Sequence, residues 1–273
     1  MDRWTLDDIP WEQLDRLKID ARTLNIIKAA SMVERQSGDY AAYLCSVFHD
    51  DPEFQQVARG WAAEEIQHGE ALRRYAETAD PEFDFEAAYT RFTDEHQLPL
   101  DATESVRGSR ARELVARCVV EVGTSTYYSA MRDATDEPVL KSLCHRIAGD
   151  EFRHYKLFYD NMKRYQAKEG LTKLARIKVV LGRLAEAEDD ELAYAYYCAT
   201  GMTGPYDREA AVCAYGAQTF SLYRFRHVQR GAGMALKAVG LRPQSLLGRM
   251  LIRFAWWRFK TRVRQFEQAP ASA

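Results

Sequence analysis

Two copies of one pattern of glutamates and histidines constrain what this chain can fold into. Each copy has a lone glutamate and, 31 or 30 residues later, a Glu-x-x-His sequence. The residues are Glu34, Glu65 and His68 in the first copy and Glu121, Glu151 and His154 in the second. Residues i and i+3 of a helix share a face, so each Glu-x-x-His directs a carboxylate and an imidazole at a common point.

Prolines fix where two of the helices begin. Pro52 and Pro138 follow acidic residues, and each comes 13 residues before a Glu-x-x-His. Proline is favoured in the first turn of a helix, and 13 residues at about 1.5 Å each place the ligands roughly 20 Å along it. The lone glutamates lie at a similar depth on the preceding helices. We therefore predict two helical hairpins whose six side chains meet at one level of a four-helix bundle, as in bundles that hold two metal ions.

The apolar periodicity predicts an all-α protein with no strand. We expect the bundle over residues 1–168 and a C-terminal helical extension over residues 169–273. The expected bundle helices are 21–48, 52–78, 109–133 and 138–167, with a short helix inside 81–108 and with Trp4 and Trp11 as packing anchors before them. The expected helices of the extension are 172–188, 190–199, 206–229 and 244–266, with breaks at 201–205, 231–233 and 240–243.

Several residues beside the six have expected supporting roles. Asp150 and Glu64 directly precede the glutamates of the two motifs, and we predict that Asp150 accepts a hydrogen bond from His68 and Glu64 from His154. Thr124 lies one turn after Glu121, facing the same side, and either donates a hydrogen bond to a bound oxygen species or bonds its own helix. The glycines near the ligands leave room for oxygen or an acyl chain, or allow helices to pack closely. They are Gly38, Gly69, Gly123 and Gly149.

Cysteine usage and hydropathy bear on where the protein works. The five cysteines are scattered, odd in number and without a Cys-x-x-Cys pair, which argues against a disulfide framework and a rubredoxin-type iron site. The acidic first residues are not those of a signal peptide, and no uncharged apolar stretch reaches about 18 residues. We expect a cytoplasmic protein, with peripheral contact to a membrane as an alternative.

The basic residues are concentrated near the C-terminus. The net charge is −2, yet residues 210–266 contain eleven Lys and Arg side chains and no Asp or Glu. The last expected helix is amphipathic. Its apolar stripe is Leu247, Met250, Leu251, Phe254 and Trp257, and its basic stripe is Arg249, Arg253, Lys260 and Arg264. Either this helix packs on the bundle with a solvated basic face, or residues 224–264 bind an anionic partner, which would be an acidic carrier protein or a membrane surface. No motif supports nucleic acid.

At these residues the sequence resembles the ferritin-like superfamily, and within it the soluble acyl-acyl-carrier-protein desaturases. The motifs that carry the resemblance are Trp61-x-Ala-Glu-Glu-x-x-His-Gly69, Glu121-x-x-Thr124 and Ile147-Ala-x-Asp-Glu-x-Arg-His154. The resemblance covers about residues 21–165. It implies that the six residues bind two iron ions, with manganese as an alternative in one position, that Thr124 lies beside the oxygen site and that Asp150 supports His68. It also implies a homodimer and a ferredoxin-type electron donor.

Three functions that use bound metal remain open from the sequence, beside a metal-free structural or interaction bundle. The first is a di-iron oxidoreductase that acts, like the desaturases, on a fatty-acyl or other lipid-like chain. The second is a hydroxylase of quinones or lipids at the membrane surface, and the third is a ferroxidase or peroxide-scavenging iron protein similar to ferritin or rubrerythrin. The Glu-to-Glu-x-x-His intervals are shorter than we expect for plant desaturases, so the substrate class is open even within the first function.

Overall fold

The computed structural model describes residues 3–95, 97–186, 190–201 and 205–268. The described residues form helices and contain no strand, which confirms the predicted all-α class. Three short 3-10 helices, Leu6–Asp8, Trp11–Gln13 and Arg16–Lys18, precede the α-helices. The helices of the first part are α1 (Ala21–Arg35), α2 (Ser37–Val47), α3 (Pro52–Ala79), α4 (Phe85–Glu95), α5 (Arg110–Ala134) and α6 (Pro138–Glu169). The helices that follow are α7 (Lys173–Glu186), α8 (Asp190–Ala199), α9 (Arg208–Phe220), α10 (Phe225–Ala238) and α11 (Leu246–Gln268).

Side-chain caps set the starts of the long helices. Asp51 accepts a hydrogen bond from the backbone N–H of Phe54, and Pro52 occupies the first turn of α3. Glu137 accepts from two backbone N–H groups at the start of α6, and Ser109 caps α5. Gly170 ends α6 with φ 63°, a left-handed conformation that glycine adopts without steric cost. These local signals put the ligand-bearing segments at the same height in neighbouring helices.

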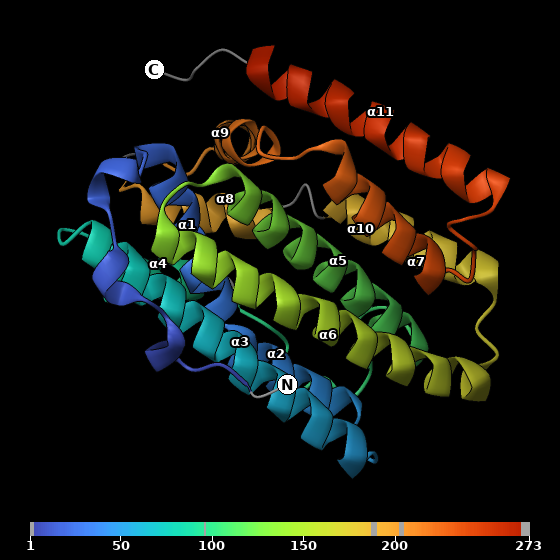
Figure 1. Ribbon diagram of the computed structural model, residues 1–273. Helices are drawn as coiled ribbons and strands as arrows, with labels where there is room; N and C mark the ends of the chain where they lie inside the picture. The colour runs from blue at the N-terminus through green and yellow to red at the C-terminus, as the bar shows by residue number, and fades with distance from the viewer. Residues whose placement is uncertain (1–2, 96, 187–189, 202–204, 269–273) are drawn as a thin grey trace.

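The long helices form a bundle of two hairpins. α5 packs along α6, α1 and α2 pack along α3, and α3 contacts α6 across the bundle (Figure 1). α10 lies on α5, and α11 lies outside α9 and α10, on the side of the molecule away from α2 and α3. Trp4 is buried in the core, as predicted, and Trp11 packs at its edge. Every helix in the described part of the chain is too short or too polar to cross a bilayer.

The single helix expected over 21–48 is wrong, because the chain divides at Gln36 into α1 and α2. The hydroxyl of Ser37 donates a hydrogen bond of 2.6 Å to the carbonyl oxygen of Glu34. In an uninterrupted helix this oxygen would accept a hydrogen bond from a backbone N–H. A side chain that enters the backbone ladder in this way bends a helix. The division falls two residues after Glu34, so this candidate ligand lies near the end of α1.

The break expected at 231–233 is also wrong, because α10 runs through both glycines and the chain turns instead after Phe220. A Cβ atom at Gly231 would lie 3.1 Å from the Thr126 methyl group and 3.3 Å from a Val122 methyl group. The glycine therefore allows α10 to approach α5 closely. Its cost in helix propensity, about 1 kcal/mol relative to alanine, is offset by this packing.

Gly69 is the glycine near the ligands whose replacement should cost the most stability. A Cβ atom there would lie 2.7 Å from the backbone nitrogen of Arg35 and 3.1 Å from the carbonyl oxygen of Ser31, so α1 and α3 would have to separate. We expect Gly69→Ala to lower the free energy of unfolding by about 1–3 kcal/mol in denaturant titrations. Gly149→Ala is the matched control, since its Cβ would meet nothing within 4 Å, and should stabilise by up to about 1 kcal/mol. Equal stability of the two variants would contradict the close packing.

Candidate metal centre

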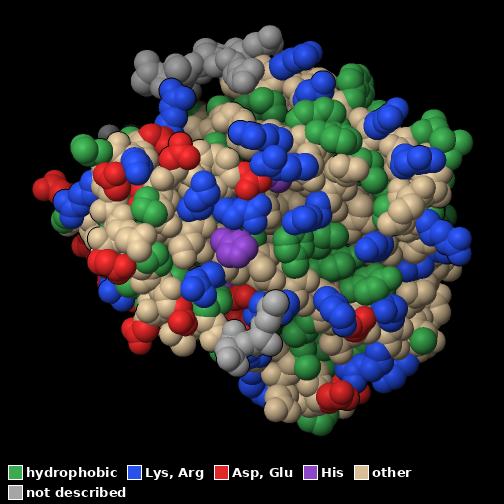
Figure 2. Space-filling view, in the orientation of Figure 1, with side chains coloured by type: hydrophobic (Ala, Val, Ile, Leu, Met, Phe, Trp, Pro, Cys, Tyr) green, Lys and Arg blue, Asp and Glu red, His purple; other side chains and the backbone are tan. Residues whose placement is uncertain are grey.

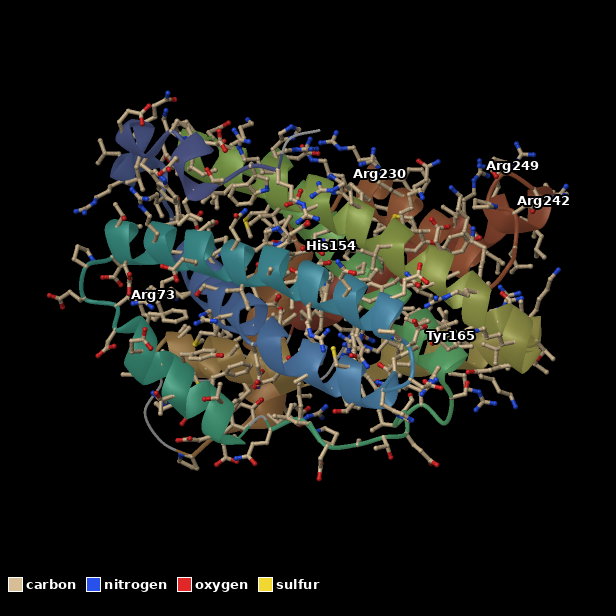
Figure 3. The ribbon with its side chains drawn as sticks, turned by 90° about the horizontal axis from the view of Figure 1, so that it is seen from below. Arg73, His154, Tyr165, Arg230, Arg242 and Arg249 are labelled. Atoms are coloured by element: carbon tan, nitrogen blue, oxygen red, sulfur yellow. The ribbon has the colours of Figure 1, made fainter. Side chains whose placement is uncertain are left out.

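Four helices each contribute to one buried cluster. Glu34 comes from α1, Glu65 and His68 from α3, Glu121 from α5, and Glu151 and His154 from α6. All six side chains are buried, and His68 has no exposed surface. His154 lies between α3 and α6 in the interior of the bundle (Figure 3). The structure thus brings together all six residues of the predicted ligand set, as the helical spacing requires.

The cluster divides into two overlapping groups, each compact enough to hold one metal ion. The first is Glu34, Glu65, His68 and Glu151, and the second is Glu65, Glu121, Glu151 and His154. Within each group the ligand atoms lie within 4.8 Å of one another. Glu65 and Glu151 belong to both groups, which makes them the candidate bridges between two ions.

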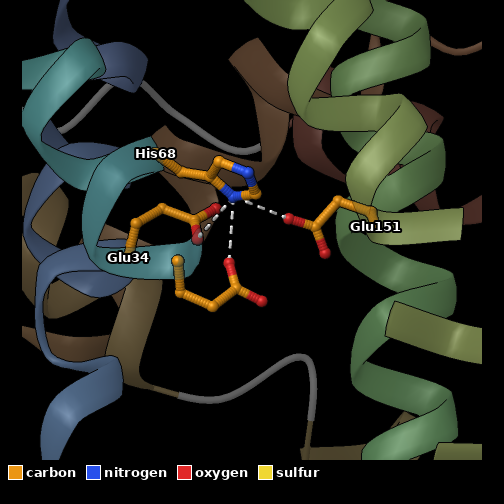
Figure 4. Close-up of side chains that lie close together, drawn as sticks. Glu34, His68 and Glu151 are labelled. Atoms are coloured by element: carbon orange, nitrogen blue, oxygen red, sulfur yellow. Dashed lines mark hydrogen bonds and ion pairs between the residues drawn. The ribbon is translucent and has the colours of Figure 1, made fainter. Parts of the chain in front are cut away.

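Glu65 and Glu151 each lie between the two histidines, with one carboxylate oxygen facing His68 and the other facing His154. Glu65 Oε2 lies 3.0 Å from Nδ1 of His68, and Oε1 lies 3.0 Å from Nδ1 of His154. Glu151 Oε1 lies 3.3 Å from Nδ1 of His68, and Oε2 lies 3.8 Å from Nδ1 of His154. Figure 4 shows the first group, in which Nδ1 of His68 points between the carboxylates of Glu34 and Glu151. Each Nδ1 atom is therefore the ring nitrogen that faces the candidate metal positions.

Several polar atoms of the cluster have no hydrogen-bond partner. They are both carboxylate oxygens of Glu121, Oε1 of Glu151 and Nδ1 of His154, which lies 3.0 Å from Oε1 of Glu65 but outside hydrogen-bond geometry. Buried polar atoms are nearly always hydrogen-bonded, because an unpaired one costs free energy. These orphaned atoms are carboxylate oxygens and an imidazole nitrogen, the donor types that iron and manganese accept. The residues therefore fit a pair of such ions.

Outer carboxylates fix the orientation of both imidazoles. Nε2 of His68 lies 3.0 Å from Oδ2 of Asp150, and Nε2 of His154 lies 3.0 Å from Oε2 of Glu64. Both predicted contacts are confirmed. With its proton on Nε2, each imidazole donates to the outer carboxylate and leaves Nδ1 as a metal ligand.

Three residues that complete this outer layer were not assigned to it from the sequence. The indole Nε1 of Trp4 donates a hydrogen bond of 2.7 Å to Asp150, and its ring stacks on that of His68 with centroids 5.9 Å apart. Arg153 donates to both Asp150 and Glu64 and so joins the two outer acids. The hydroxyl of Tyr128 donates to Glu34. The position of Tyr128 could have been predicted, because it lies two turns after Glu121 on the same face of α5. The role of Trp4 could not, because its partner Asp150 is 146 residues away in the sequence.

Thr124 faces the cluster rather than only its own helix. Its hydroxyl lies 2.6 Å from Oε2 of Glu151, to which it donates, and 3.4 Å from the carbonyl oxygens of Val120 and Glu121. The much shorter contact is the one to the cluster. A role for Thr124 beside an oxygen site stays a prediction, as does a catalytic role for Asp150.

Burial and crowding of charges shift the protonation of the cluster. Burial and the neighbouring carboxylates Glu65 and Glu151 raise the pKa of Glu34, and burial with the same kind of repulsion raises that of Glu121. Burial opposes ionisation of Glu65, but His154 and His68 outweigh it and hold its pKa well below the usual value. Burial disfavours charged histidines, yet the surrounding carboxylates raise the pKa values of His68 and His154 well above 6.5. Without a metal ion, the cluster therefore holds protons near neutral pH.

Iron binding should consequently release protons and strengthen as pH rises. The ligand atoms must be deprotonated to bind the metal, and the raised pKa values of Glu34, Glu121 and both histidines mean that protons are displaced. We expect the affinity for ferrous iron, measured anaerobically, to fall steadily from about pH 8 to about pH 6. The number of protons released to the buffer on binding should match the slope of the logarithm of the affinity against pH. A pH-independent affinity over this range would contradict the protonated cluster.

A surface pocket reaches the cluster from the side of α3 and α6. The residues that line it include Gly60, Trp61 and Glu64 of α3, His154 and Leu157 of α6, and Arg3. Arg3 pairs with Glu64 at 2.7 Å. The pocket thus meets the second group of candidate ligands at His154, whose outer hydrogen-bond partner Glu64 also lines it.

The chain matches the model of a known protein family. A sequence model described as fatty acid desaturase matches residues 45–181, just over half of the chain. The matched span contains the two Glu-x-x-His motifs and Glu121, whereas Glu34 precedes it. No curated protein matches the chain.

Proposed function

Because this chain belongs to the fatty acid desaturase family, we propose that it is a di-iron oxidoreductase of ferritin-like architecture that removes two hydrogens from a saturated acyl chain. The observation that carries the proposal is the pair of four-residue groups that share Glu65 and Glu151. Bundles that bind paired metal ions use a glutamate from each of two helices and a Glu-x-x-His motif from each of two others, and here Glu65 and Glu151 would contribute to both metal positions. The orphaned atoms of Glu121 and His154 support the same reading.

Bound iron would bind and reduce dioxygen. Carboxylate and imidazole ligands favour this chemistry because they stabilise ferric iron. The side chains of the protein prepare the site for that chemistry. Asp150 and Glu64 hold the two imidazoles with Nδ1 turned inwards. The hydroxyl of Thr124 donates its proton in a hydrogen bond to Glu151. Burial of all six ligands keeps bulk water away from the reacting atoms.

The proposed reaction balances with one external donor. Two hydrogens leave adjacent carbons of the acyl chain, and these carbons become joined by a double bond. Two further electrons come from an external donor and two protons from solvent. Together with these, the two hydrogens of the acyl chain reduce one dioxygen molecule to two water molecules. The electrons come from a small one-electron carrier of the ferredoxin type.

The test uses the iron-loaded full chain with a chemical or ferredoxin reductant, dioxygen and saturated acyl substrates. We expect a product that is lighter by two hydrogens, detected by mass spectrometry, with one dioxygen consumed per double bond. Glu70→Gln, which changes an exposed glutamate of α3 two residues after His68, is the control and should retain activity. A product that gains one oxygen atom would make the protein a hydroxylase. Oxidation of iron without any change to the acyl substrate would favour a ferroxidase.

A further inference from the structure

α11 has two apolar sides, and only one of them is covered by the protein. Ile252 and Phe266 are buried, and the inner aromatic side chains of α11 meet those of the segment around α9 and α10. Phe259 contacts Tyr223 with ring centroids 5.1 Å apart, and Trp256 contacts Phe225 at 5.9 Å. The helix is therefore held on the body of the protein through this inner side.

The opposite side of α11 carries large apolar side chains that face solvent. Leu247, Met250, Phe254 and Trp257 follow one another at steps of three or four residues, and between 55% and 60% of the surface of each residue is exposed. We name these four residues the outer stripe. They belong to the apolar stripe expected from the sequence, which therefore does not pack on the bundle. A contiguous exposed stripe of this kind marks a surface that another molecule covers.

Basic side chains border the outer stripe on both sides. On a helical wheel, Arg249 and Arg253 lie on one flank and Arg258 on the other, and all three are exposed. Within the described residues none of these three is joined to an acidic side chain, in contrast to Arg226 of α10, which pairs with Asp133 at 2.6 Å. Figure 2 shows hydrophobic and basic side chains alternating over the upper part of the molecule, where Figure 1 places α11. Arg242, just before the helix, lies next to Arg249 at the outer edge (Figure 3).

These features favour a lipid surface over the other occupants. A second copy of this chain would bring the same basic flanks against the stripe, and like charges would repel. An acidic carrier protein would complement the arginines, but a strongly acidic face has no apolar surface to cover four large side chains. The acyl region of a bilayer covers leucine, phenylalanine and tryptophan, while arginines extend their charge to anionic headgroups.

We propose that α11 is an interfacial helix that binds the protein to the surface of an anionic membrane, with the outer stripe inserted among the lipids. The helix lies on the membrane and does not cross it, in agreement with its polarity, since its 23 residues would be long enough to span a bilayer but are not apolar enough. If the protein acts on acyl chains, which rests on the function proposed above, then the membrane is the source of its substrate. The attachment itself is independent of that function.

The test measures co-sedimentation of the full, iron-loaded chain with vesicles. We expect binding to phosphatidylcholine vesicles that contain phosphatidylglycerol, and much weaker binding to phosphatidylcholine alone or at high salt. The triple variant Met250→Gln, Phe254→Gln, Trp257→Gln should bind at least about 10-fold more weakly, because it removes three interfacial anchors. A matched triple variant changes three exposed apolar residues elsewhere, Leu17→Gln, Leu100→Gln and Val106→Gln, and should bind like the wild type.

A second readout follows Trp257 itself. Its emission should shift to shorter wavelength on addition of anionic vesicles, and Trp257→Phe should abolish the shift while retaining binding. Failure of the wild type to bind anionic vesicles, or unchanged binding by the outer-stripe variant, would overturn the proposal. A wild-type dimer that the outer-stripe variant converts to a monomer would assign the surface to a second copy instead. Vesicle binding requires no turnover, so its outcome is separate from that of the desaturation test.

Discussion

Replacing Glu151 with glutamine should abolish the paired metal site. Glu151 belongs to both groups of ligands, with one oxygen 3.3 Å from Nδ1 of His68 and the other 3.8 Å from Nδ1 of His154. Glutamine keeps the size of the side chain and an acceptor for the Thr124 hydroxyl, but it loses the negative charge and one of the two oxygens. We expect binding of about two iron ions per chain to fall to one or none.

The affinity for the remaining iron should also fall by more than about 100-fold. Loss of a hydrogen bond to a ligand already costs about 10–100-fold in metal affinity, and here a ligand is lost. Anaerobic titration with ferrous iron measures both quantities, and far-ultraviolet circular dichroism checks the helical fold. Glu70→Gln removes a charge from an exposed position of α3 and should bind iron as the wild type does. Two tightly bound irons in the Glu151 variant would refute the bridging role.

Replacing Asp150 with alanine should weaken iron binding by about 10–100-fold without removing a ligand. Asp150 accepts hydrogen bonds from Nε2 of His68 and from the indole of Trp4, so its loss frees the imidazole to rotate and leaves two buried donors unpaired. The remaining ligands still define both metal positions, and for this reason we expect two irons to bind at higher concentration. The same anaerobic titration measures the change.

Two further variants separate orientation of the imidazole from general destabilisation. Trp4→Phe keeps an aromatic ring on His68 but removes the donor to Asp150, and should weaken iron binding less than Asp150→Ala does. Asp160→Ala removes an aspartate of the same helix that pairs on the surface with Lys156 and Lys163, and should leave the affinity unchanged. If Asp160→Ala and Asp150→Ala weaken binding equally, the outer hydrogen bond has no special role.

The level at which the six ligands meet could be predicted from the sequence, because it depends on local rules. The i, i+3 spacing puts Glu65 and His68 on one face of α3, and the prolines put the two motifs at equal distances from their helix starts. The predicted contact between Asp150 and His68 follows from the same register. Such inferences need only helix geometry and the pairing of two similar hairpins. The division of the chain into a bundle over 1–168 and an extension over 169–273 stays a prediction.

Other features depend on tertiary contacts that no local pattern records. Trp4 reaches Asp150 from a segment 146 residues away, and nothing around Trp4 indicates that partner. The division of the chain at Gln36 accompanies a local hydrogen bond from the Ser37 hydroxyl to Glu34, and a serine at this position is equally compatible with an unbroken helix, so the sequence does not reveal the division. In α11 the sequence shows apolar residues around much of the helix, but only the packing of Phe259 and Phe266 decides which side is covered.

The most direct test of the account is an anaerobic titration of the metal-free protein with ferrous iron, followed by admission of dioxygen. We expect saturation at about two irons per chain, as two groups with shared carboxylates require, and oxidation of both irons when dioxygen is admitted. Iron that accumulates well beyond two per chain would instead indicate storage. Absence of specific binding, with Glu121→Ala indistinguishable from the wild type, would contradict a di-iron centre at these six residues.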